Sequence, residues 1–431
     1  MVKVKTFEQL QKAINNNEKE IELLNSISSP YSLSLKDGQN INGNNNFLSF
    51  INSDGLMLEG NNKISDLSIQ TNPEKLAIFV SSELNNLGVI ELNNLTVVGV
   101  VQILTRKNNN HLKLKVNNLD IVSADSRNYP ERPMKYGVIV YQGAFTVYNF
   151  NPNPDSLIEV NIENLNIGRK NAPVIGSGVF IAGFNDDGGK VEVSKLVTKE
   201  VYSNGMIPSG VANLITGGVF ILNGTNAKEV LNKKTVTTYG TNDMALDVWG
   251  HVDNWISEDE VITFGPSGIG FVNFGTVDNF VAKKAIKTYG LGARGFNQYD
   301  GTIKKAQFHS IETFEDGSIG MQFSKPVGEI VIENDILTRG SQGETLVKGV
   351  IQNLKADAIS VKEGGEIKKL VVKGSVIVEG NDVRAFNIDN GKVDEFLLGG
   401  KLIAKRSSSK EMSVTQNGKD EIFQIEKFTE E

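Results

Sequence analysis

One spacing constrains the second half of this chain more than any other feature. Thr238, Thr263, Thr288, Thr313 and Thr338 follow one another at a constant 25-residue step without slippage. An unbroken period of roughly 20–50 residues is the signature of a solenoid, in which each repeat stacks on the next. A repeat of this length holds three strands of about five residues each, with their turns. The period therefore predicts a parallel stack in which residues 25 apart lie one above the other.

The register around the threonines is also constant. β-branched residues stand two positions before each threonine, and large apolar residues stand eight positions after it. These residues are Val236, Val261, Ile286, Ile311 and Ile336, then Leu246, Phe271, Phe296, Met321 and Leu346. Such residues are typical of strands with a buried face. We expect the buried threonine hydroxyls to bond to one another between repeats, because a buried hydroxyl needs a partner. After Thr338 we expect one shortened repeat.

The predicted fold class is all-β: a single-stranded right-handed parallel β-helix solenoid with three strands per repeat of about 25 residues. The hand follows the rule for parallel crossovers. Residues 6–15 place Phe7, Leu10 and Ile14 on one helical face behind Thr6 as N-cap, which predicts an N-terminal cap helix. We expect the β-helix to cover about 21–405 and residues 406–431 to close its C-terminal end. Without a Pro/Gly/Ser linker, 1–431 is predicted to be one domain.

A looser motif marks the first half. Asp66, Asn94, Asn118 and Asn164 are each followed by Leu and, two residues later, by Ile or Val. Lys195-Leu196-Val197-Thr198 continues the motif. We expect the leucines to face inward and the preceding Asp or Asn to sit at a turn, where its side chain bonds to the backbone.

The steps between these motifs are uneven, and the surplus residues fall mainly after the same strand. They form three predicted loops, at 123–136, 168–177 and 199–217. Insertions at one corner of a solenoid project from one face, which is commonly the binding face. We therefore expect the three loops to border one groove that reaches Asp243, Asp247 and Arg294.

Composition excludes several classes of protein. The net charge is −7 without a block of Lys or Arg, so nucleic-acid binding is not expected. No apolar run approaches the length of a membrane-spanning helix, so we expect no membrane span. The first residues lack the apolar core of a secretory signal, which leaves a cytoplasmic protein or a mature form whose leader was removed. With no cysteine and three dispersed histidines, we expect neither a metal centre nor another cofactor.

The candidate site residues are two carboxylates and a group of cations and tyrosines. Asp243 and Asp247 flank one strand near the long loops, where they could act as acid and base on a glycosidic bond. Ordinary solvated turn positions are the alternative. The candidates for substrate binding are Arg127, Tyr129, Arg132, Lys135, Arg169, Lys170, Tyr202 and Arg294. They would suit an anionic or polyhydroxylated chain, since an Arg guanidinium can donate two hydrogen bonds to one carboxylate. A mobile set of charged loops without a ligand is the alternative.

Two further columns have both a structural and a functional interpretation. Tyr239, Phe264, Tyr289 and Phe314 recur at the 25-residue step and end at Arg339. They could form a platform for sugar rings or a stack that tightens the corner. Asp253 and Asp278 lie in equivalent turns one repeat apart. Like charges at that distance could hold a cation or raise one pKa, or could simply be a structural turn.

The cap, the three-strand repeats and the stacked Asn, Thr and aromatic columns resemble the pectate-lyase-like superfamily of right-handed parallel β-helices, over most of residues 20–405. The resemblance implies the fold. Of the polygalacturonase-like catalytic motifs, only the fragments Asn242-Asp243 and Gly250-His251-Val252 are present. They are too close in sequence to lie on different repeats, so the resemblance implies no particular activity.

The sequence thus predicts a carbohydrate-binding or carbohydrate-processing protein that takes an oligo- or polysaccharide in a loop-walled groove. Catalysis stays open; if it occurs, the chain would be a polysaccharide lyase or a glycoside hydrolase. The alternative is a non-catalytic structural, adhesive or tailspike-like module. A glycan is the expected partner, and a homo-oligomer such as a trimer is left open.

Overall fold

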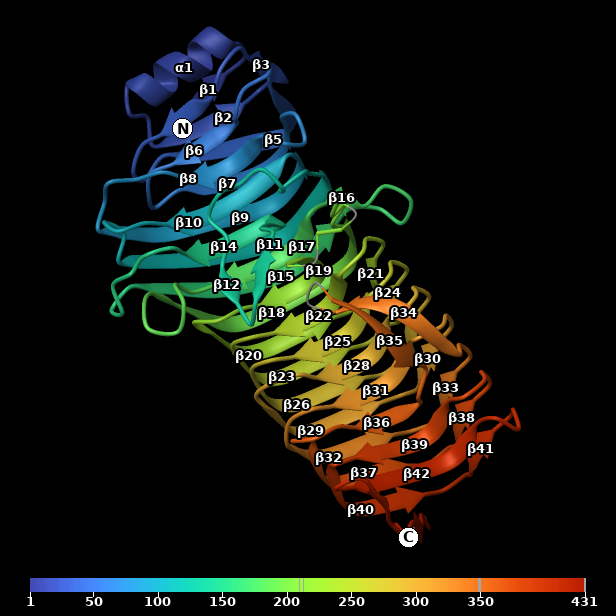
Figure 1. Cartoon of the computed structure of the whole chain (residues 1–431). Helices are drawn as coiled ribbons and strands as arrows, with labels where there is room; N and C mark the ends of the chain where they lie inside the picture. The colour runs from blue at the N-terminus through green and yellow to red at the C-terminus, as the bar shows by residue number, and fades with distance from the viewer. Residues whose placement is uncertain (209, 212, 348–349, 430–431) are drawn as a thin grey trace. The chain divides into compact units, whose positions relative to one another are not determined.

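The computed structural model describes residues 1–208, 210–211, 213–347 and 350–429, and it is all-β with long parallel sheets (Figure 1). Among these residues the one helix is α1 (Phe7–Asn15), and no helix is long and apolar enough to cross a membrane. The chain divides into two compact units. Unit 1 comprises Met1–Pro133, Tyr141–Ser203 and Phe220–Val230; unit 2 comprises Met134–Val140, Asn204–Val219 and Leu231–Glu431.

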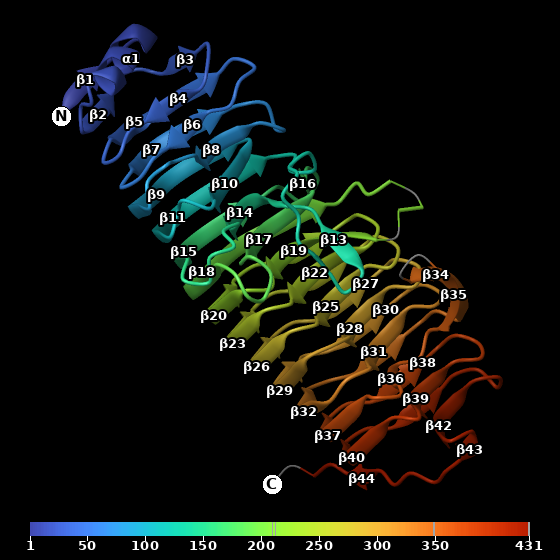
Figure 2. The ribbon, with the colours of Figure 1, turned by 60° about the vertical axis from the view of Figure 1, so that its left-hand side comes forward.

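The predicted helix and its N-cap are confirmed at the start of unit 1. The Thr6 hydroxyl accepts a hydrogen bond from the Gln9 backbone N–H at 3.3 Å, which satisfies one of the free donors of the first turn. Leu10 and Ile14 are buried. Their face of α1 packs against three strands, seen beside it in Figure 2: β1 (Val2–Val4), β3 (Ile27–Ser29) and β4 (Leu33–Leu35).

Unit 1 contains two series of parallel strands. The first consists of β2 (Glu20–Leu23), β5 (Asn40–Phe50), β7 (Lys63–Gln70), β9 (Asn86–Val98), β11 (His111–Ser123), β15 (Leu157–Ile167) and β18 (Lys190–Asn204). The second consists of β4, β6 (Leu56–Leu58), β8 (Leu76–Val80), β10 (Val100–Thr105), β14 (Gly143–Asn149) and β17 (Ser177–Ala182). The predicted leucines Leu67, Leu95, Leu119 and Leu165 align from strand to strand and are buried.

The polar residue before each leucine bonds differently from the prediction. Asp66, Asn94, Asn118 and Asn164 all have φ between 52° and 59°, a left-handed conformation that Asn and Asp tolerate best. Asn118 Nδ2 donates to Asn94 Oδ1 at 3.2 Å, and Asn94 Nδ2 donates to Asp66 Oδ1 at 2.9 Å. The side chains of Asp66, Asn94 and Asn118 therefore form a ladder with one another. The continuation at Leu196 was aligned wrongly, because Leu165 pairs with Thr198 after a register shift.

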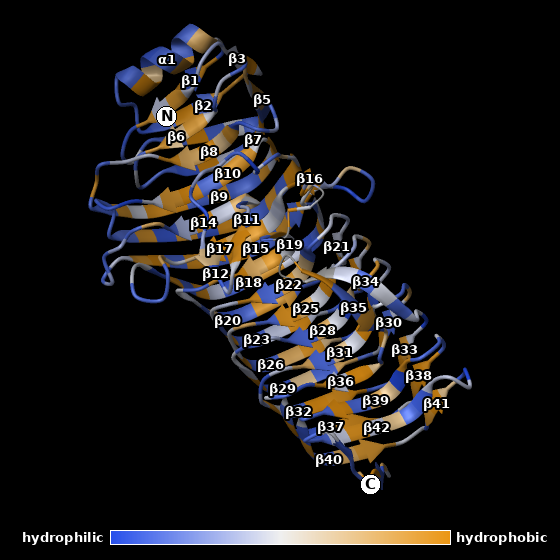
Figure 3. Cartoon of the chain, in the orientation of Figure 1, coloured by the Kyte–Doolittle hydropathy of each residue, from blue (hydrophilic) through white to orange (hydrophobic). Residues whose placement is uncertain are grey.

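Unit 2 contains three series of parallel strands, which carry both apolar and polar residues in Figure 3. The first is β21 (Val236–Thr238), β24 (Val261–Thr263), β27 (Ile286–Thr288), β30 (Ile311–Thr313), β33 (Ile336–Thr338), β38 (Val376–Val378) and β41 (Leu402–Ala404). The second is β22 (Asp243–Val248), β25 (Ile269–Asn273), β28 (Arg294–Gln298), β31 (Ile319–Phe323), β36 (Ile359–Val361), β39 (Arg384–Asp389) and β42 (Lys410–Gln416). The third is β23 (His251–Ser257), β26 (Thr276–Ala282), β29 (Thr302–Phe308), β32 (Val327–Ile332), β37 (Glu366–Val372) and β40 (Lys392–Leu398).

The threonine column is confirmed in position but not in bonding. Thr238, Thr263, Thr288, Thr313 and Thr338 pair in register and are fully buried. The first three hydroxyls have no hydrogen-bond partner among the described residues. The last two donate to backbone carbonyl oxygens at 2.8 and 2.7 Å. The expected hydroxyl-to-hydroxyl bonds between repeats are therefore wrong.

The repeat after Thr338 is lengthened, which corrects the expected shortened one. Thr338 pairs with Val378, which lies well beyond one constant step. The surplus forms an antiparallel hairpin of β34 (Gln342–Val347) and β35 (Val350–Lys355). Leu346 belongs to this hairpin, and Met321 pairs instead with Ile359. The C-terminal tail adds the short strands β43 (Lys419–Asp420) and β44 (Glu426–Lys427), while residues 430–431 of the predicted 406–431 cap lie outside the described residues.

Candidate functional site

The second strand series of unit 2 breaks the usual alternation of side chains between two faces. Phe296 is fully buried, and its ring meets Phe308 and Phe323 at 5.2 and 5.5 Å. Its neighbour Gly295 faces the same interior, because a Cβ there would lie 2.3 Å from Ile311 Cγ2. Two consecutive inward residues leave the residues on either side, at 294 and 297, to face outward together.

Arg294 and Asn297 line a cavity of about 480 Å³ that lies within unit 2. Its wall combines aromatic rings with amide side chains. The aromatic members are Tyr136, Phe274 and Tyr299, and the amide members are Asn242, Asn297, Gln322 and Gln352. Lys325 and Lys362 also line the cavity, and no Asp or Glu does so among the described residues. A mostly apolar cavity of this size with a few convergent polar groups is typical of a small-molecule site.

The Arg294 guanidinium is the most unusual group in the cavity. Arg294 is only 7% exposed, and burial lowers its pKa to about 10, so it keeps its charge at neutral pH. Its Nε lies 3.4 Å from Gln322 Oε1, and no carboxylate among the described residues forms an ion pair with it. A buried charge normally has a partner, since desolvation costs several kcal/mol. Asn297 Oδ1, in the same wall, is also buried without a partner in the described chain.

Aromatic rings from two parts of unit 2 form one side of the cavity. Phe274 and Tyr299 stand one repeat apart with ring centroids 4.7 Å apart. Tyr136 stacks on Phe274 at 4.6 Å and meets Trp249 edge-on at 5.4 Å. Tyr136 lies between β12 (Met134–Lys135) and β13 (Val138–Val140), and β13 pairs with β19 (Leu214–Ile221). The hairpin thus places an aromatic ring from a distant part of the sequence against the wall.

Asp243, predicted to be a catalytic acid or base, is fully buried in a network of donors. Its carboxylate accepts from the Gly240 N–H at 2.7 Å, from the Gly205 N–H at 3.2 Å and from the Thr216 hydroxyl. Burial raises the pKa of Asp243 to about 6, although the hydrogen bonds oppose that rise. The neighbours Asn242 and Met244 line the cavity, but Asp243 does not.

Asp247 is also fully buried, although its register position places it on the outer face with Val272. Trp249 Nε1 donates to Asp247 Oδ2 at 3.2 Å, and Oδ1 has no partner among the described residues. Burial raises the pKa of Asp247 well above its ordinary value. The alternative of an ordinary solvated position is therefore wrong for Asp247, because the Trp249 indole bonds to a residue that the period places outside.

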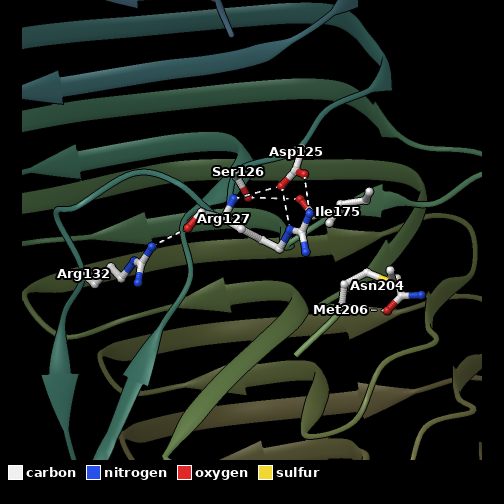
Figure 4. Close-up of polar contacts among 7 residues, drawn as sticks. All are labelled: Asp125, Ser126, Arg127, Arg132, Ile175, Asn204 and Met206. Carbon is white, nitrogen blue, oxygen red and sulfur yellow. Dashed lines mark hydrogen bonds and ion pairs between the residues drawn. The ribbon is translucent and has the colours of Figure 1, made fainter. Parts of the chain in front are cut away.

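Three of the six predicted binding cations, Arg127, Arg132 and Arg169, have hydrogen-bond partners within unit 1. Arg127 pairs with Asp125 through two hydrogen bonds of 2.9 and 2.7 Å, and Arg132 donates to the Arg127 backbone oxygen (Figure 4). Arg132 also donates to the Tyr129 backbone oxygen at 2.9 Å. The Tyr129 hydroxyl donates to the Glu74 backbone oxygen. These contacts hold the loop at 123–136 in place, and a binding role for Arg127, Tyr129 and Arg132 stays a prediction.

The remaining candidates are dispersed. The Arg169 guanidinium donates two hydrogen bonds to the Asp120 carboxylate, from Nη1 to Oδ1 at 2.9 Å and from Nη2 to Oδ2 at 2.8 Å. Lys170 is exposed and Tyr202 is buried, both in unit 1. Lys135 lies in unit 2, with its Nζ 5.0 Å from the Tyr136 ring centroid.

The loops meet in part. Within unit 1, Asp125 forms a parallel bridge with Ile175, so the loops at 123–136 and 168–177 touch (Figure 4). Within unit 2, Tyr136 and Ile215 bring parts of two loops into the cavity of Arg294. Residues 209 and 212 of the 199–217 loop lie outside the described residues. A single groove bordered by all three loops stays a prediction.

The aromatic column is confirmed as a stack. Neighbouring rings of Tyr239, Phe264, Tyr289 and Phe314 lie 4.3–5.3 Å apart with interplanar angles of 8–16°, and the Arg339 guanidinium lies 4.6 Å from the Phe314 ring centroid. The ring faces inside the column are covered by one another, which favours the structural interpretation over a sugar platform.

Asp253 and Asp278 lie within strands β23 and β26, so the predicted turns are wrong here; with His251 they gather three groups of the metal-binding kind. His251 Nε2 lies 2.8 Å from Asp253 Oδ1, and Lys304 Nζ lies 2.8 Å from Asp278 Oδ1. Lys304 already neutralises Asp278, so these three groups do not by themselves indicate a metal ion.

Sequence reasoning named Arg294 but missed the residues around it. The small residue before each large apolar one in this series, as at Gly270-Phe271 and Gly295-Phe296, signals the broken alternation that turns position 297 outward. No protein-family model, curated protein or solved structure matches the chain. The function therefore has to be argued from the site.

Proposed function

We propose that the chain is a single right-handed parallel β-helix of the pectate-lyase-like kind, with α1 as its N-terminal cap. Parallel pairing at a constant 25-residue step in unit 2 supports the stacking. The buried face of α1, which packs on the first strands, supports the cap. Open ends of such stacks need covering, because the terminal repeat otherwise exposes apolar side chains.

We propose further that unit 2 binds an acidic saccharide, with its carboxylate on Arg294. One observation carries the proposal: a buried guanidinium without a carboxylate partner in the described chain lines a cavity of about 480 Å³. The displacement of the pKa of Arg294 to about 10 corresponds to about 3 kcal/mol of destabilisation of the charged form. A ligand carboxylate would offset this cost through two parallel N–H···O bonds.

The rest of the wall suits a sugar. Hydroxyls can both donate and accept hydrogen bonds, and the amides of Asn242, Asn297 and Gln322 offer both roles. The C–H face of a sugar ring is apolar and would pack against Tyr299, because the Phe274 ring already contacts both Tyr136 and Tyr299. Lys325 and Lys362 add positive charge, which favours an anionic ligand over a neutral one.

Binding is favoured over hydrolysis. A glycosidase needs two carboxyl groups on either side of the scissile bond, and among the described residues no carboxyl group lines the cavity. Asp243 and Asp247 are buried beside it, so they support the wall. Turnover of a saccharide by the wild type that is lost in Asp243→Ala and Asp247→Ala would reverse this preference.

The test is titration calorimetry with glucuronate and with glucose as its neutral counterpart. We expect glucuronate to bind, glucose to bind more weakly, and Arg294→Met to weaken glucuronate binding by about 10- to 100-fold, since a hydrogen-bonded charge contributes about 1.5–3 kcal/mol. Arg169→Met is the matched control, because Arg169 is already paired with Asp120. Equal affinity for both sugars, or an unaffected Arg294→Met, would refute the proposal. No binding to any saccharide would leave the structural or adhesive module as the function.

A further inference from the structure

The hairpin that contributes Tyr136 has an unfavourable residue at its turn. Lys135 pairs with Val138 across two residues, Tyr136 and Gly137, whose φ values are 55° and 82°. A two-residue hairpin with both central residues at positive φ is the turn type that strongly prefers Asn-Gly. A bulky aromatic residue in this conformation costs about 1–2 kcal/mol. The turn therefore keeps a strained residue where Asn would relieve the strain.

The strained backbone position places the Tyr136 ring at the cavity. The ring lines the cavity of Arg294, stacked on Phe274 at an interplanar angle of 28°. Its hydroxyl donates to the Phe274 backbone oxygen at 3.1 Å, which fixes the ring over the wall. Backbone strain that surrounding contacts maintain is concentrated at functional sites, where it holds a group in place for a ligand.

We propose that Tyr136 is a specificity-determining residue of this cavity: the face of its ring that is turned away from Phe274 packs against the C–H face of a cyclic sugar whose carboxylate is held by Arg294. The inference rests on the proposed function and adds a second requirement to it. Arg294 selects for the negative charge, and Tyr136 selects for a closed ring. An open-chain sugar acid carries the same charge but has no flat apolar face to stack on an aromatic ring.

Glucuronate and gluconate separate the two requirements, because both have six carbons and one carboxylate but only glucuronate is a ring. We expect the wild type to prefer glucuronate by about tenfold, the order of one aromatic contact of about 0.5–1.5 kcal/mol. Tyr136→Asn preserves the turn, removes the ring and should bind the two acids equally. Tyr136→Phe keeps the ring and should retain the preference. Arg294→Met should weaken both acids alike.

Tryptophan fluorescence gives an independent measurement on the same protein. The chain has two tryptophans, and Trp249 is the one that touches Tyr136. Glucuronate should therefore change the emission of the Trp255→Phe variant and leave that of Trp249→Phe unchanged.

The outcomes distinguish the two claims. The inference about Tyr136 is wrong if Tyr136→Asn still prefers glucuronate. It is also wrong if this variant weakens the binding of both acids equally, as loss of a purely structural contact would. In both cases the proposed function stands. If Tyr136→Phe loses the preference as fully as Tyr136→Asn, the hydroxyl tether is what matters and the inference is again wrong. If neither acid binds the wild type, both claims fail.

Discussion

Asp243 should make the stability of unit 2 fall as the pH rises from acid to neutral. Burial raises the pKa of Asp243 from 3.8 in the ordinary case to about 6, so the folded state binds more protons than the unfolded state between these values. Where the folded state binds more protons, stability decreases with rising pH. The full difference of about two pKa units corresponds to about 3 kcal/mol at neutral pH. Between pH 4 and pH 7 it amounts to about 2 kcal/mol.

Asp243→Asn isolates this contribution. An Asn side chain can accept from the Gly205 and Gly240 N–H groups through Oδ1 and donate to the Thr216 hydroxyl through Nδ2, as the protonated acid would. We therefore expect the variant to fold normally and to lack the part of the pH dependence that Asp243 causes. Relative to wild type, Asp243→Asn should gain about 2 kcal/mol between pH 4 and pH 7.

Guanidinium chloride unfolding followed by tryptophan emission is the appropriate assay. Trp249 and Trp255, the two tryptophans of the chain, both belong to unit 2, so the signal reports the unfolding of that unit. Asp247 also has a raised pKa, but it is present in both proteins and cancels in the comparison. Parallel pH profiles for wild type and Asp243→Asn would refute the reasoning, because they would mean that Asp243 does not titrate in this range.

Three further predictions concern stability. Thr288→Val should stabilise the protein by about 1 kcal/mol, because the Thr288 hydroxyl is buried without a partner in the described chain. Thr313→Val should destabilise it by a similar amount, because it removes the hydrogen bond to the Ser318 backbone oxygen. Thermal unfolding of the two variants compares the two effects. Gly295→Ala should cost about 1–3 kcal/mol, because the new Cβ would overlap Ile311, and an unchanged melting temperature would contradict the proposed break in alternation. Asn118→Gly should be tolerated better than Asn118→Ala by about 1 kcal/mol in denaturant unfolding, because the position has a φ of 57°; equal stabilities would contradict that expectation.

The 25-residue period predicted which residues stack on one another, but it did not predict the contacts and the hairpins that interrupt the stack. Thr263 and Phe264 align with their counterparts as expected, because a constant step fixes which residues are neighbours. Asp247 shows the limit: its register position is outward, but the period carries no information on the indole that lies over it. The Tyr136 hairpin shows the same limit, since a contact between Tyr136 and Phe274 obeys no period. Leu346 matched the 25-residue spacing but lies in the β34–β35 hairpin and not in the parallel stack, because spacing alone does not detect an inserted hairpin.

The constant step in unit 2 also determines how this part of the chain can change length. Strand β24 pairs in register with β21, one period before it, and with β27, one period after it. Removal of one whole period between Thr263 and Thr288 would place each remaining residue against a neighbour of the same kind. Removal of a single residue from a strand would instead turn every later side chain of that strand to the opposite face. We therefore expect this region to tolerate insertions and deletions of whole repeats, or changes within the turns between strands. The unit can lengthen by duplication of a repeat, because each added repeat buries the same kinds of side chain against its neighbours.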